Sequence, residues 1–291
     1  MDTNYFITKN EGKIKQLFIE TMNESYGYFY LVAMHKLIRQ NPFDSIAIGV
    51  SYGNNLLIEK HFKGGLVKFC KDYQDVYYDF LHLKRAVENS MSRIRRCFCI
   101  WGYWSIAYDI SLGKTKETET RRSIEYTLFK DPHHWTYPHD IWGYVRNTFE
   151  NPDEFKLAAD FIENLALKGF ISDDAKNPQL LTYYNKYHLQ EMSGCKYTGS
   201  YRTIPEDTRE MIGKHRAEVH NKLIRYEKTI SENTQIISNM LEYMQRNDIT
   251  PIVIFPPFSK AYLNNLDPQY KKIKNPDLQT VPKCVIIEAL Q

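Results

Sequence analysis

The chain has 291 residues, of which 43% are hydrophobic and 25% are charged, and its formal net charge is +3. This size allows one large α/β domain or two small ones, and the near balance of charges argues against a nucleic-acid-binding protein. The spacing of the five cysteines fits neither a zinc site nor a disulfide framework. No secretory leader or membrane-length apolar run is recognisable, so we expect a cytoplasmic protein that does not span a membrane.

The first elements alternate between helical patterns and short apolar runs. Residues 1–42 are expected to form an N-terminal helical segment, with a helix from about 13 to 40 that breaks near Gly27. Buried strands are predicted at 46–50, 97–101 and 252–255, a weaker strand at 66–70, and a last apolar run at 284–287. A helical pattern at 75–89 lies between the predicted strands at 66–70 and 97–101. This alternation predicts a three-layer α/β fold, with a mainly parallel sheet and helices on both faces.

The α/β domain is expected to span 43–291 and to carry an insertion at about 105–203. This insertion is rich in aromatic residues, histidine and proline, has weak periodicity, and is interpreted as short helices and long loops. After it, apolar residues at steps of three and four predict one long amphipathic helix over 208–247. The stripe expected to face the sheet includes Val219, Leu223, Tyr226, Ile230 and Ile237.

A serine between two glycines follows the first predicted strand, in the order Gly49-Val50-Ser51-Tyr52-Gly53. Ligands of open parallel sheets bind beyond the carboxyl ends of the strands. The glycines allow a tight strand-to-helix turn that exposes the serine Oγ, and the N–H groups that follow could hold an oxyanion. A polar turn capped by Ser51 explains the spacing equally well. The α/β-hydrolase elbow is disfavoured because several strands should precede its serine.

Five blocks of sequence, taken in order, resemble the SGNH hydrolases, and more particularly a bacterial group of SGNH-like proteins distantly similar to the D-alanyl-lipoteichoic-acid transfer protein. The resemblance implies hydrolysis or transfer of an acyl ester, commonly on cell-envelope carbohydrates or carrier-bound substrates, with Ser51 as nucleophile and no cofactor. The substrate-binding residues expected are Tyr52, Asn54, Asn55, Gln74 and Asp75. The blocks are Phe43–Tyr52, Gln74–Asp79, Asp131–Trp135, Tyr226–Asn233 and Ile252–Pro257.

The chain departs from the SGNH pattern near its end. SGNH enzymes carry an Asp-x-x-His pair after the last strand, whose histidine is the general base, but no histidine follows His220 here. His215 and His220 are interpreted as surface or packing residues. His133 or His134 could substitute as the base for Ser51, although a solvent-facing loop is the more ordinary interpretation of that segment.

Without a base, a serine hydroxyl is a weak nucleophile. The alternative function is therefore that of an inactive or truncated SGNH-like relative that binds a carbohydrate or a protein partner. The histidines and acids between 131 and 140 lack the regular spacing of metal ligands, so no metal site is predicted. Two further Asp-x-x-His matches, at Asp79 and Asp131, lie in the wrong part of the chain for the SGNH pair.

Overall fold

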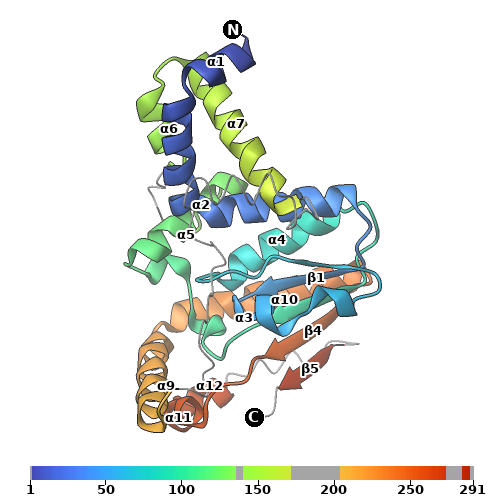
Figure 1. Ribbon diagram of the computed structural model, residues 1–291. Coiled ribbons are helices and arrows are strands. Elements are labelled where there is room, and N and C mark those ends of the chain that lie inside the picture. The colour runs from blue at the N-terminus through green and yellow to red at the C-terminus, as the bar shows by residue number, and fades with distance from the viewer. Residues whose placement is uncertain (1, 136–139, 172–203, 273–283, 289–291) are drawn as a thin grey trace. The chain divides into compact units, whose positions relative to one another are not determined.

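The computed structural model describes residues 2–135, 140–171, 204–272 and 284–288 (Figure 1). The chain divides into a helical unit, formed by residues 1–37 and 113–195, and an α/β unit, formed by residues 38–112 and 196–291. The domain bounds expected from the sequence stay a prediction. Among the described helices, none is long and apolar enough to cross a membrane.

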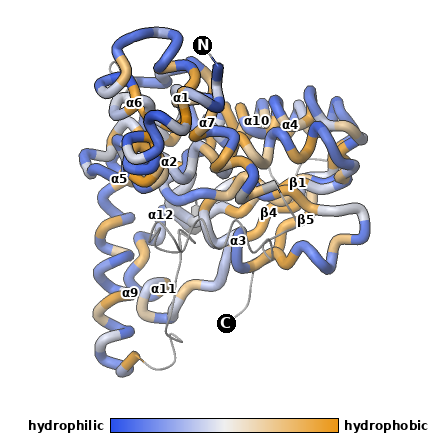
Figure 2. Tube along the Cα trace, turned by 45° about the horizontal axis from the view of Figure 1, so that its top comes forward, coloured by the Kyte–Doolittle hydropathy of each residue, from blue (hydrophilic) through white to orange (hydrophobic). Residues whose placement is uncertain are grey.

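The α/β unit contains a five-stranded sheet in which every neighbouring pair is parallel. The strand order is β2-β1-β3-β4-β5, which confirms the predicted parallel sheet. Hydrophobic residues run along the strands, whereas hydrophilic residues recur along helices such as α9 (Figure 2). The strands are β1 (Ser45–Gly49), β2 (Leu66–Lys68), β3 (Arg96–Ile100), β4 (Thr250–Phe255) and β5 (Val285–Glu288).

Both faces of this sheet are covered by helical segments, as the three-layer prediction requires. The face that carries Ala47 and Phe98 packs with Leu57 and Phe62, which flank α3 (Tyr52–Leu56) and the 3-10 turn η1 (Glu59–His61). On the other face, Phe69 stacks on His82 of α4 (Val76–Asn89), and α4 contacts α10 (Glu227–Arg246). Connections between parallel strands are right-handed. The connection from β1 to β2 moves toward one edge of the sheet and the later connections move toward the other edge, so their helical segments cover opposite faces.

The prediction of one helix over 208–247 is wrong. The segment forms α9 (Glu206–Asn221), a short 3-10 turn η5 (Lys222–Arg225) and α10, and Tyr226 leaves helical geometry with φ −90° and ψ 67°. Helix α9 packs on α11 (Lys260–Asn265), where a β-carbon at Gly213 would lie only 2.8 Å from that of Ala261. Because α9 packs on α11, the expected stripe does not face one common partner: Val219 on α9 is 40% exposed, while Ile237 on α10 is buried.

In the helical unit, four of the five described helices contribute side chains to a core that includes Phe6, Phe18, Phe29 and Ile162. The break expected near Gly27 occurs at Ser25, which has non-helical φ and ψ. The described part of the insertion is more helical than expected, and α7 alone has 20 residues. Residues 172–203 of the insertion and residues 275–283 of the tail lie outside the described ranges. The helices are α1 (Thr3–Lys9), α2 (Glu11–Gln40), α5 (Lys116–Phe129), α6 (Gly143–Thr148) and α7 (Pro152–Ile171).

Candidate functional site

The strand order reverses between β1 and β3, so the carboxyl ends of these two strands form the switch point at which doubly wound sheets bind ligands. At the end of β1, Gly49 has a φ of +107°, and a β-carbon there would clash with the carbonyl oxygen of Ile100. The N–H of Val50 donates to that same carbonyl at 2.9 Å. Only glycine fits position 49, because the chain must turn while it lies against β3.

Ser51 follows this turn and immediately precedes α3, at the strand-to-helix junction that the sequence indicates. Its side chain does not cap α3, so the interpretation as a capping serine is wrong. Within the described ranges, the Ser51 Oγ has no hydrogen-bond partner. The N–H groups of Gly53 and Asn54 donate to the carbonyls of Val50 and Ser51, at 3.1 and 3.0 Å. These two N–H groups are thus already engaged in the turn.

Asp79 of α4 lies beneath the turn and holds three segments together. One of its carboxylate oxygens accepts from the N–H of Gly49 at 2.8 Å and from Gln74 Nε2 at 2.5 Å. The other accepts from Trp101 Nε1 at 3.0 Å. Asp79 is 1% exposed. A buried carboxylate with several donors is well satisfied, so Asp79 fixes the ends of β1 and β3 relative to α4.

Gln74 and Asp75 are buried in this same support. Asp75 caps α4: one of its oxygens accepts from the N–H of Tyr78 at 3.1 Å, and the other from the N–H of Ile110 at 3.0 Å. Burial raises the pKa of Asp75 to about 7, against the lowering effect of these two hydrogen bonds. Gln74 and Asp75 therefore both make hydrogen bonds that support the fold. Their expected role in substrate binding stays a prediction.

The other residues expected to bind the substrate, Tyr52, Asn54 and Asn55, lie in α3. Asn54 Nδ2 donates to the carbonyl of Cys70 at 3.1 Å, and the buried Lys68 Nζ donates to the carbonyl of Asn54 at 3.0 Å. Lys68 also reaches the carbonyl of Leu57, which ties the loop after Ser51 to β2. Asn55 and Tyr52 are exposed. Of this group, Tyr52 alone directs its ring toward an aromatic neighbour that follows another strand.

That neighbour belongs to an aromatic cluster, which we define as Tyr52, Tyr103, Trp104, Phe258 and His220. The first four follow the carboxyl ends of β1, β3 and β4. The ring centroid of Phe258 lies 6.0 Å from that of Tyr52 and 5.5 Å from those of Tyr103 and Trp104. The Trp104 ring stacks on His220 at 3.9 Å. Beyond a general richness in aromatic residues, no pattern in the sequence indicates this cluster.

His220 is the described histidine that joins this cluster, and its contacts are those of a packing residue. Its Nδ1 lies 2.9 Å from the Tyr262 hydroxyl, and its carbonyl accepts from the Tyr270 hydroxyl at 2.6 Å. Burial, together with the nearby charge of Arg216, lowers the pKa of His220 to about 3. The imidazole is therefore neutral at physiological pH and has little basicity, as the packing interpretation expects.

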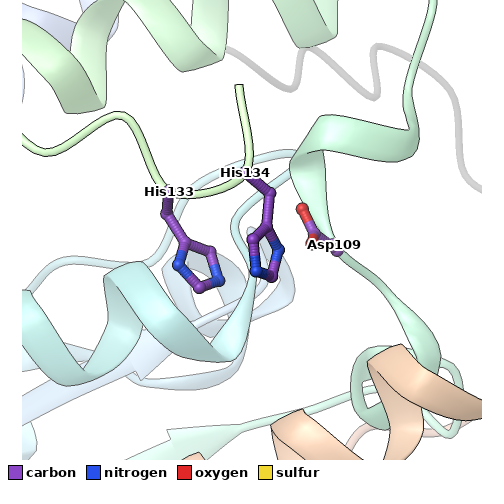
Figure 3. Close-up of side chains that lie close together, drawn as sticks. All are labelled: Asp109, His133 and His134. Atoms are coloured by element: carbon purple, nitrogen blue, oxygen red, sulfur yellow. The ribbon is translucent and has the colours of Figure 1, made fainter. Parts of the chain in front are cut away.

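His133 and His134 belong to the helical unit, and their rings stack with centroids 3.9 Å apart (Figure 3). Asp109, which Figure 3 also labels, belongs to the α/β unit, and so does Ser51, which the figure does not show. Asp140, from the same histidine-rich segment, pairs with Arg146 at 2.8 Å, while His139 lies outside the described residues. The role of His133 or His134 as a base for Ser51 stays a prediction.

Comparison with known proteins adds no identification. No protein-family model matches the chain, and neither the curated proteins nor the solved structures include a significant match.

Proposed function

We propose that the α/β unit is a serine-dependent esterase or acyltransferase of the SGNH type, in which Ser51 attacks an acyl ester. The observation that carries this proposal is the position of Ser51 at the switch point, with a side chain that neither caps the helix nor donates to another described residue. A serine at a turn can bond its hydroxyl to the neighbouring backbone, and Ser51 makes no such bond to the start of α3. A nucleophile instead needs its Oγ to be accessible to the substrate.

The rigid support of the turn favours the same function. Three donors on Asp79 hold the turn, and Lys68 holds the loop that follows Ser51. A reacting group gains from such positioning, because a fixed geometry removes part of the entropic barrier. The low basicity of His220 and the absence of a described hydrogen bond to Ser51 predict a slow reaction unless a base is supplied from elsewhere in the chain.

The proposal is tested by the hydrolysis of short-chain aryl esters. The unchanged protein should turn over such esters slowly, and Ser51→Ala should reduce the rate to that of the buffer. Ser231→Ala provides a matched control, since Ser231 is an exposed serine on α10 and its loss should leave the rate unchanged. Equal rates for the protein and for Ser51→Ala would reject catalysis by Ser51.

The aromatic cluster favours a second candidate function, the binding of a carbohydrate or a protein partner without catalysis. Tyr52 is 42% exposed beside the serine, and aromatic faces bind sugars and partner side chains through their large apolar area. Under this alternative, Tyr52→Ala would weaken binding in a glycan screen at least tenfold, while Ser51→Ala would bind as well as the unchanged protein and neither would hydrolyse esters.

A further inference from the structure

The strand β5 forms one edge of the parallel sheet (Figure 1). It pairs with β4 on its inner side, and among the described residues no strand pairs with its outer side. An edge strand presents N–H and C=O groups that have no partner within its own sheet. The outer side of β5 therefore has the hydrogen-bonding groups to accept one more strand.

The side chains of β5 are exposed on both faces of the sheet. Val285, Ile286 and Ile287 are 45%, 37% and 44% exposed. Because successive side chains of a strand alternate between faces, Val285 and Ile287 lie on one face and Ile286 on the other. The helical layers that bury β1 thus leave β5 uncovered. Proteins usually protect such an edge with lysine, proline or a bulge, and these three positions carry neither lysine nor proline.

The opposite edge of the sheet has a different character. It is formed by β2, whose three residues are all buried. Lys68 at its end donates to the carbonyls of Asn54 and Leu57, which fastens the neighbouring loop over β2. This edge offers a second copy no exposed apolar side chains. Pairing of β5 with β2 of another copy, which would continue into an open filament, is therefore disfavoured.

The exposed part of β5 complements itself when two copies are related by a two-fold axis. With the axis at Ile286 and the two strands antiparallel, Ile286 lies opposite Ile286 of the second copy. Val285 then lies opposite Ile287 in both directions. Each of these positions carries a β-branched apolar side chain, and such cross-strand pairs stabilise a sheet. No charged residue occupies the three positions, so the pairing brings no like charges together.

We propose that β5 is the interface of a homodimer, in which two copies pair their β5 strands antiparallel and join their sheets into one. A two-fold arrangement closes after two copies. Stable complexes bury about 1,200–2,000 Å², whereas this contact is limited to one short strand from each copy. We therefore expect a dimer that dissociates on dilution. This proposal does not depend on the function proposed for Ser51.

The proposal is tested by sedimentation equilibrium of the full chain from nanomolar to high micromolar concentration. The mass should rise from that of one chain to that of two and then stay constant. Ile286→Lys should weaken association at least tenfold, because two ammonium groups would meet across the axis. Ile58→Lys is the matched control, since Ile58 is a 50% exposed isoleucine of the same unit outside the sheet, and it should leave association unchanged.

Hydrogen exchange of the unchanged chain makes the test independent of how Ile286→Lys folds. The amides of residues 285–287 should exchange more slowly at high micromolar than at nanomolar concentration, because pairing protects the outer N–H groups. The proposal is overturned if the chain stays monomeric at high micromolar concentration or if these amides exchange at the same rate throughout. It is also overturned if the mass grows beyond two copies, or if Ile58→Lys weakens association as much as Ile286→Lys.

Discussion

Asp75 and Asp79 show how single buried carboxylates hold the switch point. Asp79 joins the ends of β1 and β3 to α4, and Asp75 joins the start of α4 to the N–H of Ile110. The two differ in their surroundings, since Asp79 accepts from a glutamine amide and an indole N–H as well as from backbone. Asp75 is held by backbone donors alone among the described residues, and burial raises its pKa to about 7.

This raised pKa predicts a pH dependence of stability. Because the folded pKa of Asp75 lies above its ordinary value of 3.8, the folded state holds the proton more tightly than the unfolded state. The stabilising contribution of Asp75 is complete below about pH 4 and is lost as the pH rises through 7. Relative to Asp75→Asn, the free energy of unfolding should fall across this window, by up to about 1.4 kcal/mol per pH unit.

Urea unfolding between pH 4 and pH 8 measures this difference. Asp72→Asn serves as the control, because Asp72 is exposed three residues earlier, and its pH profile should follow that of the unchanged protein. If Asp75→Asn also follows the unchanged protein across the window, the burial of an ionisable group at position 75 is not a source of pH dependence.

The sequence predicts Gly49 and Ser51 correctly as parts of a turn because the signal is local: two glycines flank a serine directly after an apolar run. The role of Asp79 is not visible in the same way. Its partners Gly49 and Trp101 are 30 and 22 residues away, so the reason for a carboxylate at that position appears only once the chain has folded. A polar residue on a largely apolar helix face is the one local sign of such a contact.

At the scale of elements, the strands were predictable and the break between α9 and α10 was not. Strands β1, β3 and β4 are apolar runs bounded by polar or turn-forming residues, and their burial on both sheet faces follows from that composition. The apolar periodicity across 208–247 continues through the break at Tyr226 because both helices bury a stripe. They bury it against different partners: α9 against α11, and α10 against the sheet and α4.

Because α9 and α10 pack against different partners, truncating side chains of the predicted apolar stripe should lower the free energy of unfolding by different amounts on the two helices. Ile237 on α10 is 3% exposed, so Ile237→Ala should lower the free energy of unfolding by about 2–5 kcal/mol. Val219 on α9 is 40% exposed, and Val219→Ala should cost about 0.5 kcal/mol or less. Chemical unfolding of the two variants checks this, and equal losses would mean that α9 and α10 bury a common stripe.

At the scale of the molecule, the apolar runs at 46–50, 97–101 and 252–255 predict neighbouring strands of a parallel sheet, and the adjacent strands β1, β3 and β4 confirm this. The sequence does not predict the positions of β2 and β5 in the sheet or the division into two units. The order places β1 between β2 and β3, and this arrangement creates the switch point beside Ser51. Apolar runs carry no information about the direction of each crossover, and this direction decides on which side of β1 the weaker strand β2 lies.

The central claim, that Ser51 is the reactive residue of the switch point, is tested most directly by covalent labelling. The full chain is incubated with a fluorophosphonate, and the modified residue is located by mass spectrometry of its peptides. We expect slow, saturating modification of Ser51, with no modification of the exposed Ser231 and no label in Ser51→Ala. A label on another residue, or a Ser51 that stays unmodified after prolonged incubation with excess reagent, would contradict the claim.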